Sequence, residues 1–233
     1  MKKQHSSNRA ILILESPWEL DCNDSNRTSV TPFVEGIGKL AGDTEVYHAN
    51  FYDKSSFIKA LNCLCKRKFK NTTVYIAAHG YKKKIGNISI SDLIWEVGLK
   101  SNECNITGLM LGSCFVGENS STMEVFLEGN NLKWCVGYSS TSKWLEGTLI
   151  DCAILSGMSE LDESDYSDKN EIIHHFANSI AAFSNSFHIG EDYNGNAVPL
   201  EDSLQFVMQP NGQGKRARSV SAEVFAVMKS LQI

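Results

Sequence analysis

Short apolar runs alternate with stretches of helical periodicity along most of the chain, and each run has the length of a buried β-strand. The first run covers residues 10–14, and a weaker one follows at 44–48. Further predicted strands cover residues 73–78, 106–112, 133–138 and 204–208. Strands that are apolar on both faces are typical of a parallel sheet covered on its two sides.

Helical periodicity fills the intervals between these strands. One predicted helix begins after Ser55 or Ser56, and another is capped by Ser91 and ends at Gly98. A capping-box pattern over residues 121–124 predicts a third helix. The helix after residue 138 is predicted to carry one apolar stripe of Leu145, Leu149, Cys152 and Ala153. Two more amphipathic helices are indicated by Ile173, Phe176, Ile180 and Phe183, and by Val220, Val224, Val227 and Leu231.

This alternation predicts an α/β fold with a mainly parallel, roughly six-stranded sheet flanked by helices. No repeat, low-complexity tract or linker divides the sequence, so residues 1–233 are expected to form a single domain. Residues 1–9 are polar and are predicted to be a flexible tail. The other predicted connections are a hairpin around Gly86 and Asn87, an exposed acidic loop over 159–171 and a flexible basic loop over 211–218.

The charge balance limits what the chain is expected to bind. With 22 lysines and arginines against 27 aspartates and glutamates, the net charge is −5. Because no overall positive field attracts a polyanion, direct nucleic-acid binding is not expected. No apolar run approaches the roughly 18–20 residues that cross a bilayer. The run at residues 10–14 is also too short for the core of a secretory signal, so we expect a cytoplasmic protein.

Seven cysteines are present, an odd number that a closed set of disulfides does not produce. The sequence also lacks the repeated C-x-x-C pairs of a structural zinc site. We therefore expect reduced thiols, most of them small core residues, and neither a metal nor a cofactor. Cys114 is set apart from the others by its position at the end of a strand.

Two strands end on residues that are able to do chemistry. His79-Gly80 follows the strand at 73–78, and Ser113-Cys114 follows the strand at 106–112. The carboxyl ends of parallel strands meet at one edge of a sheet, and the segment between these two strands suits one crossover helix. We therefore expect His79 and Cys114 side by side. Either residue alone is more often structural, and it is their combination on one predicted edge that favours a site.

A cysteine beside a histidine is suited to nucleophilic catalysis. The imidazole accepts the proton of the thiol and stabilises the thiolate, which is the reactive form. The tetrahedral intermediate of peptide cleavage also needs donors for its oxyanion. The backbone N–H groups of Gly80 and Cys114 are the candidates for these donors, since Gly80 has no side chain that would block the approach.

These two motifs resemble the signature of the caspase-like cysteine peptidases (clan CD), which include caspases, metacaspases, gingipains, separases and bacterial CHAT domains. The resemblance is closest to the CHAT domains, in which a short segment like residues 88–93 separates the histidine strand from the cysteine strand. Residues 137–144 also look like the stretch after the fifth strand of those domains. The resemblance spans roughly residues 10–157.

The resemblance implies an endopeptidase that uses a Cys-His dyad and no cofactor. It implies that His79 is the general base, that Cys114 is the nucleophile and that the N–H groups of Gly80 and Cys114 form the oxyanion hole. The arginine with which caspases read an aspartate has no counterpart after Leu14, where this chain has Glu15-Ser16-Pro17. A basic substrate residue is expected instead.

Three carboxylates are candidates for contacting that basic residue: Glu15, Asp21 and Asp151. The ordinary role of an exposed or capping carboxylate is the more common one for each of them. The choice among them stays open at the level of sequence.

Two functions remain in contention. The first is a cytosolic cysteine endopeptidase that cleaves a protein partner, as related bacterial domains do in defence or programmed-death pathways, after activation by a separate protein. The second is a non-catalytic binding module on the same fold, a pseudo-peptidase. A phosphate-binding domain is disfavoured, because Gly36-Ile37-Gly38 lacks the rest of a glycine-rich phosphate loop.

Overall fold

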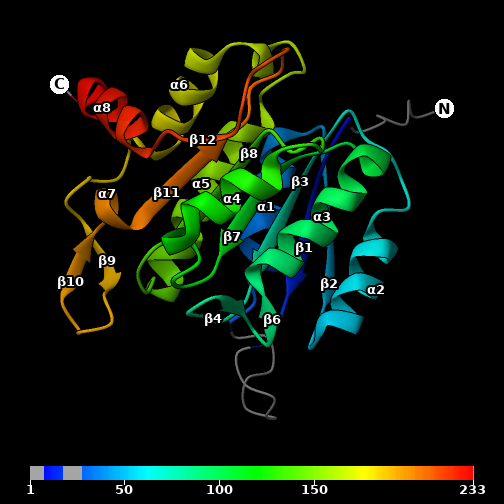
Figure 1. Cartoon of the computed structure of the whole chain (residues 1–233), viewed down its shortest axis with the longest axis horizontal. Helices are drawn as coiled ribbons and strands as arrows, with labels where there is room; N and C mark the ends of the chain where they lie inside the picture. The colour runs from blue at the N-terminus through cyan, green and yellow to red at the C-terminus, as the bar shows by residue number, and fades with distance from the viewer. Residues whose placement is uncertain (1–7, 18–27, 233) are drawn as a thin grey trace.

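A seven-stranded sheet runs through the middle of the molecule (Figure 1). The computed structural model describes residues 8–17 and 28–232. Along the sheet the strand order is β12-β11-β8-β7-β3-β1-β2. The strands are β1 (Arg9–Glu15), β2 (Thr44–Asn50), β3 (Asn71–Ala77), β7 (Ile106–Gly112), β8 (Trp134–Tyr138), β11 (Leu204–Met208) and β12 (Arg218–Ser219).

The sheet is mainly parallel, as the sequence predicts. Strands β2, β1, β3, β7 and β8 pair in parallel, and β11 and β12 add two antiparallel steps at one edge. Six of the strands fall on predicted segments, and the seventh, β12, is a pair of residues at the end of the predicted basic loop. The α/β fold class is therefore confirmed, with one short strand more than expected.

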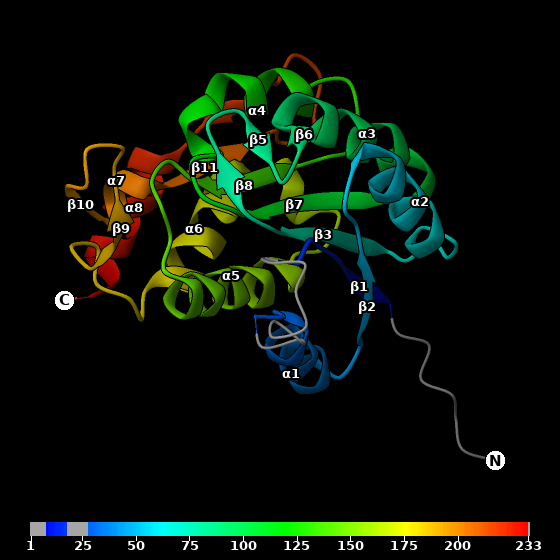
Figure 2. The same cartoon turned by 90° about the horizontal axis from the view of Figure 1, so that it is seen from below.

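Helices cover both faces of the sheet. Figure 2 shows α2, α3 and α4 on one face and α1, α5 and α6 on the other. Two separate apolar cores result, and β1 supplies both, with Ile11 and Ile13 in one and Leu12 and Leu14 in the other. The helices are α1 (Thr31–Ala41), α2 (Lys54–Leu64), α3 (Ile90–Cys104), α4 (Ser120–Leu127), α5 (Trp144–Ser159), α6 (Lys169–Ile180), α7 (Leu200–Ser203) and α8 (Ser221–Leu231).

Several helix starts differ from the prediction. Asp53, rather than Ser55 or Ser56, caps α2, and its carboxylate accepts the Ser56 N–H at 2.7 Å. Ser89, rather than Ser91, caps α3 by accepting the Asp92 N–H at 3.1 Å. In each case a polar residue further upstream is the N-cap. The predicted caps Ser55, Ser56 and Ser91 therefore lie inside the helices.

Two further boundaries were wrong for different reasons. Gly98 does not end α3, because it lies inside the helix at a close contact, where a Cβ would come 2.8 Å from Nδ2 of Asn130. Helix α3 instead ends at Cys104, and the C-cap residue Asn105 adopts the left-handed conformation. The predicted capping box at residues 121–124 is also wrong, since α4 already begins at Ser120, directly after the 3-10 turn Gly117–Asn119.

The predicted apolar stripe of α5 matches its buried face only in part, since Cys152 is buried. Leu145 and Leu149 are exposed, whereas Ile150 and Ile154 are buried against the sheet. This helix is apolar on most of its circumference, so periodicity alone did not identify the face that the sheet covers. At the chain end, Leu231 of α8 is likewise exposed rather than buried.

Small hairpins surround the carboxyl edge of the sheet. Strands β4 (Gly80–Tyr81), β5 (Lys84–Ile85) and β6 (Ile88–Ser89) form a three-stranded sheet, and β5 pairs with β6 across the predicted turn at Gly86 and Asn87. The hairpin of β9 (His188–Glu191) and β10 (Ala197–Pro199) was not predicted. Among the described residues no helix is both long enough and apolar enough to cross a bilayer.

Gly108 of β7 gives a direct test of the core. A Cβ at this position would lie 2.2 Å from the indole ring of the fully buried Trp134. We predict that Gly108→Ala lowers the free energy of unfolding by about 1–3 kcal/mol or more, because the indole has no space to move into. Urea denaturation measures this change.

Gly36→Ala is the matched control for that measurement. A Cβ at Gly36 meets nothing within 4 Å. The residue lies within α1, so alanine should leave the stability unchanged or raise it by up to about 1 kcal/mol. Equal effects of the two substitutions would contradict the packing described here.

Candidate active site

The two predicted chemical motifs meet at the carboxyl edge of the sheet. Strands β3 and β7 are parallel neighbours, and Ala77 pairs with Gly112 at their last common position. Immediately beyond, the chain runs through His79-Gly80 on one side and Ser113-Cys114 on the other. The expected adjacency of the two strands is therefore present.

Gly80 touches the backbone of Cys114. A Cβ at Gly80 would lie only 1.9 Å from the carbonyl oxygen of Cys114 and 2.7 Å from its nitrogen. A side chain at this position is excluded by a collision with backbone, which cannot rotate away as a side chain can. Glycine is thus required for the close approach of the two segments, and this approach brings the residue after His79 against the residue that carries the thiol.

The His79 segment is held by the hairpin that follows it. The carbonyl oxygen of His79 accepts the N–H of Gly86 at 2.7 Å, and β4 begins at the next residue. The His79 side chain is exposed, although the two residues before it, Ala77 and Ala78, are buried. An exposed imidazole at the sheet edge is accessible to a proton donor and to solvent.

Cys114 is half-buried, and its sulfur accepts a hydrogen bond. The N–H of Ser142 lies 3.3 Å from Sγ. Burial raises the pKa of the Cys114 thiol, while the N–H groups of Ser142 and of Cys114 itself oppose that rise. The thiol is therefore protonated at neutral pH and needs a base before it can act as a nucleophile.

Phe115, directly after the cysteine, has an unusual backbone conformation. Its φ is 60°, in the left-handed region that bulky side chains rarely occupy. Two contacts hold it: its N–H donates to the carbonyl of Ser140 at 3.0 Å, and its ring stacks on Tyr193 at 4.1 Å between ring centroids. This turn carries the chain away from the strand just after Cys114.

A narrow pocket of about 30 Å³ opens beside the sulfur. Its walls include Val30 and Trp144, and the indole N–H of Trp144 donates to the carbonyl of Thr28 at 2.9 Å. Its polar lining includes Ser113, Ser142, Thr148 and Asp151. The Oγ atom of Ser113 is buried and has no hydrogen-bond partner among the described residues, so it remains able to bind a polar group.

Asp151 is the predicted candidate that lies in this pocket. Its side chain is buried, and its two oxygens accept hydrogen bonds of 2.7 Å from the hydroxyls of Tyr75 and Tyr138. Burial raises the pKa of Asp151 to about 7, although the two tyrosine hydroxyls oppose the rise. The carboxyl group is thus poised between its neutral and ionised forms near neutral pH.

Glu15 has contacts within the chain itself. Its carboxylate accepts the hydroxyl of Ser29 at 2.8 Å and the N–H of Val30 at 2.9 Å, and it lies 3.1 Å from Nε2 of His48. Glu15 does not line the pocket, but it positions Val30, which does. Asp21, the third candidate, lies outside the described residues.

Sequence reasoning missed the groups that complete the surroundings of the sulfur. Phe115 and Tyr193 carry no motif, because their contact depends on the turns after β7 and β9. Ser142 lies in the segment 137–144 that carries part of the resemblance, but its hydrogen bond to the sulfur was not predicted. No group of three histidine, cysteine, aspartate or glutamate side chains in residues 8–17 and 28–232 is arranged to hold a metal ion.

Comparison with known proteins identifies the fold. No protein-family model matches the chain, and no curated protein matches it significantly. Among solved structures, the chain is similar to a secreted C11 cysteine protease from Bacteroides thetaiotaomicron, solved in complex with an irreversible peptide inhibitor. The match has a TM-score of 0.50 and 7% identity, and it covers 94% of this chain and 67% of the protease.

This likeness shows that the chain shares its fold with a C11 cysteine protease, which agrees with the caspase-like α/β fold expected from the sequence. At such low identity it shows the fold and not the activity. The closer resemblance to CHAT domains stays a prediction from the sequence.

The pKa of Asp151 leads to a prediction about stability. A raised pKa means that the folded chain holds this proton more tightly than the unfolded chain does. The stability that it contributes is complete below about pH 4 and is lost as the pH rises towards 7, at up to about 1.4 kcal/mol per pH unit. We predict that Asp151→Asn removes this loss and so flattens the stability profile.

Urea denaturation between pH 5 and pH 8 measures the slope, which is independent of any fixed cost of the substitution. Glu35→Gln, which changes an exposed carboxylate on α1, is the control and should follow the parent profile. Parallel profiles for Asp151→Asn and the parent would show that Asp151 is already ionised throughout this range.

Proposed function

We propose that this protein is a cysteine endopeptidase in which Cys114 is the nucleophile and His79 the general base. The observation that carries the proposal is the contact between Gly80 and the Cys114 backbone at the carboxyl edge of the sheet. This contact brings the segment that contains His79 against Cys114. The fold in which it occurs is shared with a cysteine protease. Because burial raises the pKa of the Cys114 thiol, the thiol needs a neighbouring base to become a nucleophile.

The proposed reaction begins with transfer of the thiol proton of Cys114 to the imidazole of His79. The thiolate attacks the carbonyl carbon of the scissile peptide, and the N–H groups of Gly80 and Cys114 stabilise the oxyanion. The imidazolium then gives its proton to the leaving amine, which releases one product and leaves a thioester on Cys114. Water, deprotonated by His79, hydrolyses the thioester and regenerates the thiol.

We propose that the pocket beside the sulfur takes a basic side chain of the substrate. It contains the carboxyl group of Asp151 and the unpartnered hydroxyl of Ser113, and no lysine or arginine lines it. A bound cation favours the ionised form of Asp151, so binding lowers the pKa of this carboxyl and releases a proton near neutral pH. The volume of about 30 Å³ has room for only one or two water molecules, so the pocket must widen to take a side chain.

The narrow pocket is also consistent with a resting state that another protein opens. The sequence resemblance to CHAT domains suggests such a separate activator, together with a single protein substrate and a role in bacterial defence or programmed death. We keep these as parts of the proposal, along with a cytoplasmic location.

The second candidate is a non-catalytic binding module. The raised pKa of Cys114 and the small volume beside it favour this alternative, since both disfavour attack by the sulfur in the resting state. Turnover distinguishes the two candidates, because a pseudo-peptidase binds its partner without cleaving it.

Substitution of the two dyad residues tests the catalytic proposal. We predict that Cys114→Ala and His79→Ala each reduce cleavage of a peptide library at least ~100-fold, because the first removes the nucleophile and the second the base. Mass spectrometry of the peptide library measures the cleavage. The assay is run with and without a lysate of the cells that produce this protein, as a source of the activator. Circular dichroism confirms that the variants are folded.

Cys63→Ala is the matched control, since Cys63 is an exposed thiol on α2 with no link to the site. It should cleave like the parent chain. Cleavage that survives in Cys114→Ala, or that is lost equally in Cys63→Ala, contradicts the assignment.

The identity of the cleaved residue tests the proposed pocket. We predict that peptides with lysine or arginine before the scissile bond are cleaved at least about tenfold faster, in kcat/KM, than matched peptides with aspartate there. Asp151→Asn should reduce this preference by raising KM for the basic peptides, because it removes the partner of their positive charge. A preference for aspartate would overturn the pocket assignment while leaving the dyad intact.

A further inference from the structure

Aromatic side chains extend the site beyond the cysteine. The ring of Phe115 stacks on Tyr193 with an angle of 9° between the planes, and Tyr81 meets Tyr193 edge-on with centroids 6.3 Å apart. Tyr81 is 60% exposed and Tyr193 is 50% exposed. The hairpin after His79 and the hairpin of β9 and β10 therefore meet through exposed aromatic surface next to Cys114.

Both hairpin tips are fixed by local interactions. At the first, Lys82 adopts the left-handed conformation with φ 53°, which a turn usually assigns to glycine. At the second, the carboxylate of Asp192 accepts the N–H groups of Asn194 and Asn196, each at 2.8 Å. The hydroxyl of Tyr193 donates to Glu118 at 3.1 Å. The surface between the tips is thus organised before any ligand binds.

Three consecutive lysines line this surface. Lys82, Lys83 and Lys84 are exposed, and none of them forms an ion pair with a carboxylate among the described residues. The Nζ atom of Lys82 lies over the ring of Tyr81, 5.1 Å from its centroid. Together with Tyr81, Tyr193 and Glu118, the lysines line a groove of about 1030 Å³, which we call the lysine groove.

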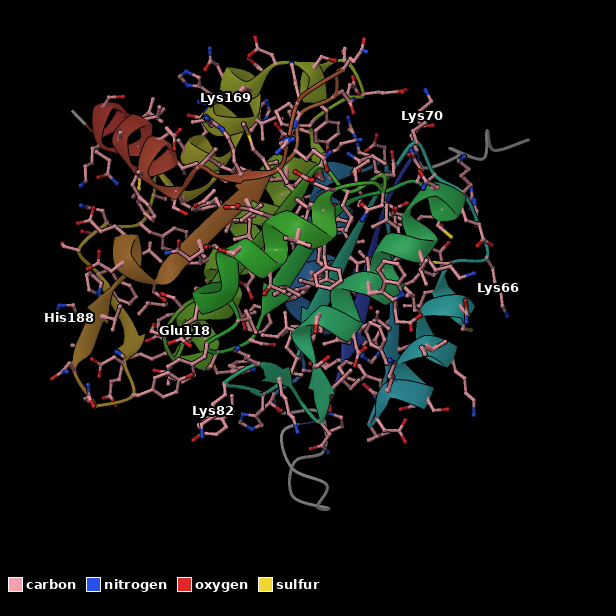
Figure 3. The ribbon with its side chains drawn as sticks, in the orientation of Figure 1. Lys66, Lys70, Lys82, Glu118, Lys169 and His188 are labelled. Carbon is pink, nitrogen blue, oxygen red and sulfur yellow. The ribbon has the colours of Figure 1, made fainter. Side chains whose placement is uncertain are left out.

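The lysine groove lies beside the proposed catalytic residues. Tyr81 follows Gly80 directly, and Tyr193 covers the residue after Cys114. Figure 3 shows Lys82 and Glu118 at this edge of the molecule, far from Lys66 and Lys70. A polypeptide that presents a bond to Cys114 is therefore within reach of the groove on one side of that bond.

We propose that the lysine groove binds an acidic segment of the polypeptide substrate, next to the bond that is cleaved. The inference rests on the proposed peptidase function and adds a second feature of the substrate. Three unpaired ammonium groups against one carboxylate, in a chain of net charge −5, make this region locally positive. The tyrosine rings offer apolar surface to the stems of glutamate and aspartate side chains.

Lysines beside aromatic rings also suit single-stranded nucleic acid. The carboxylate of Glu118, which lines the groove, disfavours a continuous chain of phosphates along it. Spaced carboxylates, in contrast, can pair with the lysines without lying against Glu118. We therefore favour an acidic peptide, and binding of nucleic acid is an outcome that the experiment detects.

The experiment uses two fluorogenic peptides that share one central lysine. One has two glutamates on each side of it and the other has glutamines. We expect kcat/KM to be about tenfold higher for the glutamate peptide at low salt and the difference to shrink as salt is added. The variant K82Q/K83Q/K84Q should lose the difference between the two peptides.

The variant K66Q/K68Q/K70Q is the matched control. It removes the same three charges from exposed lysines elsewhere on the surface, and it should keep the preference for the glutamate peptide. If both triple variants lose the preference equally, the effect comes from net charge alone, and the proposed groove is overturned.

A binding measurement separates this proposal from the peptidase proposal. Fluorescence anisotropy of the labelled glutamate peptide with the Cys114→Ala variant reports binding without cleavage. Binding that needs Lys82–Lys84 supports the groove even if the parent chain cleaves nothing. Equal affinity for the glutamate and glutamine peptides overturns it, and so does tighter binding of a labelled oligothymidylate that needs the same three lysines.

Discussion

The site depends on one close contact between two backbone segments. Gly80 lies against the carbonyl and nitrogen of Cys114, at a distance that admits no side chain. The contact is possible because β3 and β7 pair in parallel and end together, so the residues after each strand emerge at the same edge. The proposed dyad of His79 and Cys114 and the proposed oxyanion donors depend on this contact, because it brings the two segments together.

Burial shifts the pKa of two groups near the sulfur towards their neutral forms. Burial keeps the thiol of Cys114 protonated, and burial also raises the pKa of Asp151 to about 7. Two features of opposite sign lie near Cys114: the pocket that contains the carboxyl group of Asp151 and the lysine groove of Lys82–Lys84. A substrate with a basic residue beside acidic ones matches both features. Its basic side chain pairs with Asp151, and its acidic side chains pair with the lysines of the groove.

The sequence predicts the strands that carry the candidate site better than the side-chain contacts around it. Buried parallel strands appear as continuous apolar runs, so the pattern predicted the ends of β3 and β7 and the placement of His79 and Cys114 just beyond them. The stack of Tyr193 on Phe115 was not predicted, because it depends on how the unpredicted β9–β10 hairpin packs against a distant turn. The buried face of α5 was missed because an apolar helix has no single stripe.

The most direct test of the central claim is a crystal structure of the chain after reaction with an irreversible peptidyl inhibitor that carries a lysine. The account predicts a covalent bond to Sγ of Cys114 and a ring nitrogen of His79 within about 3.2 Å of the sulfur or the bound group, directly or through one water. An unmodified Cys114, or an imidazole of His79 that points away from the adduct, would contradict it.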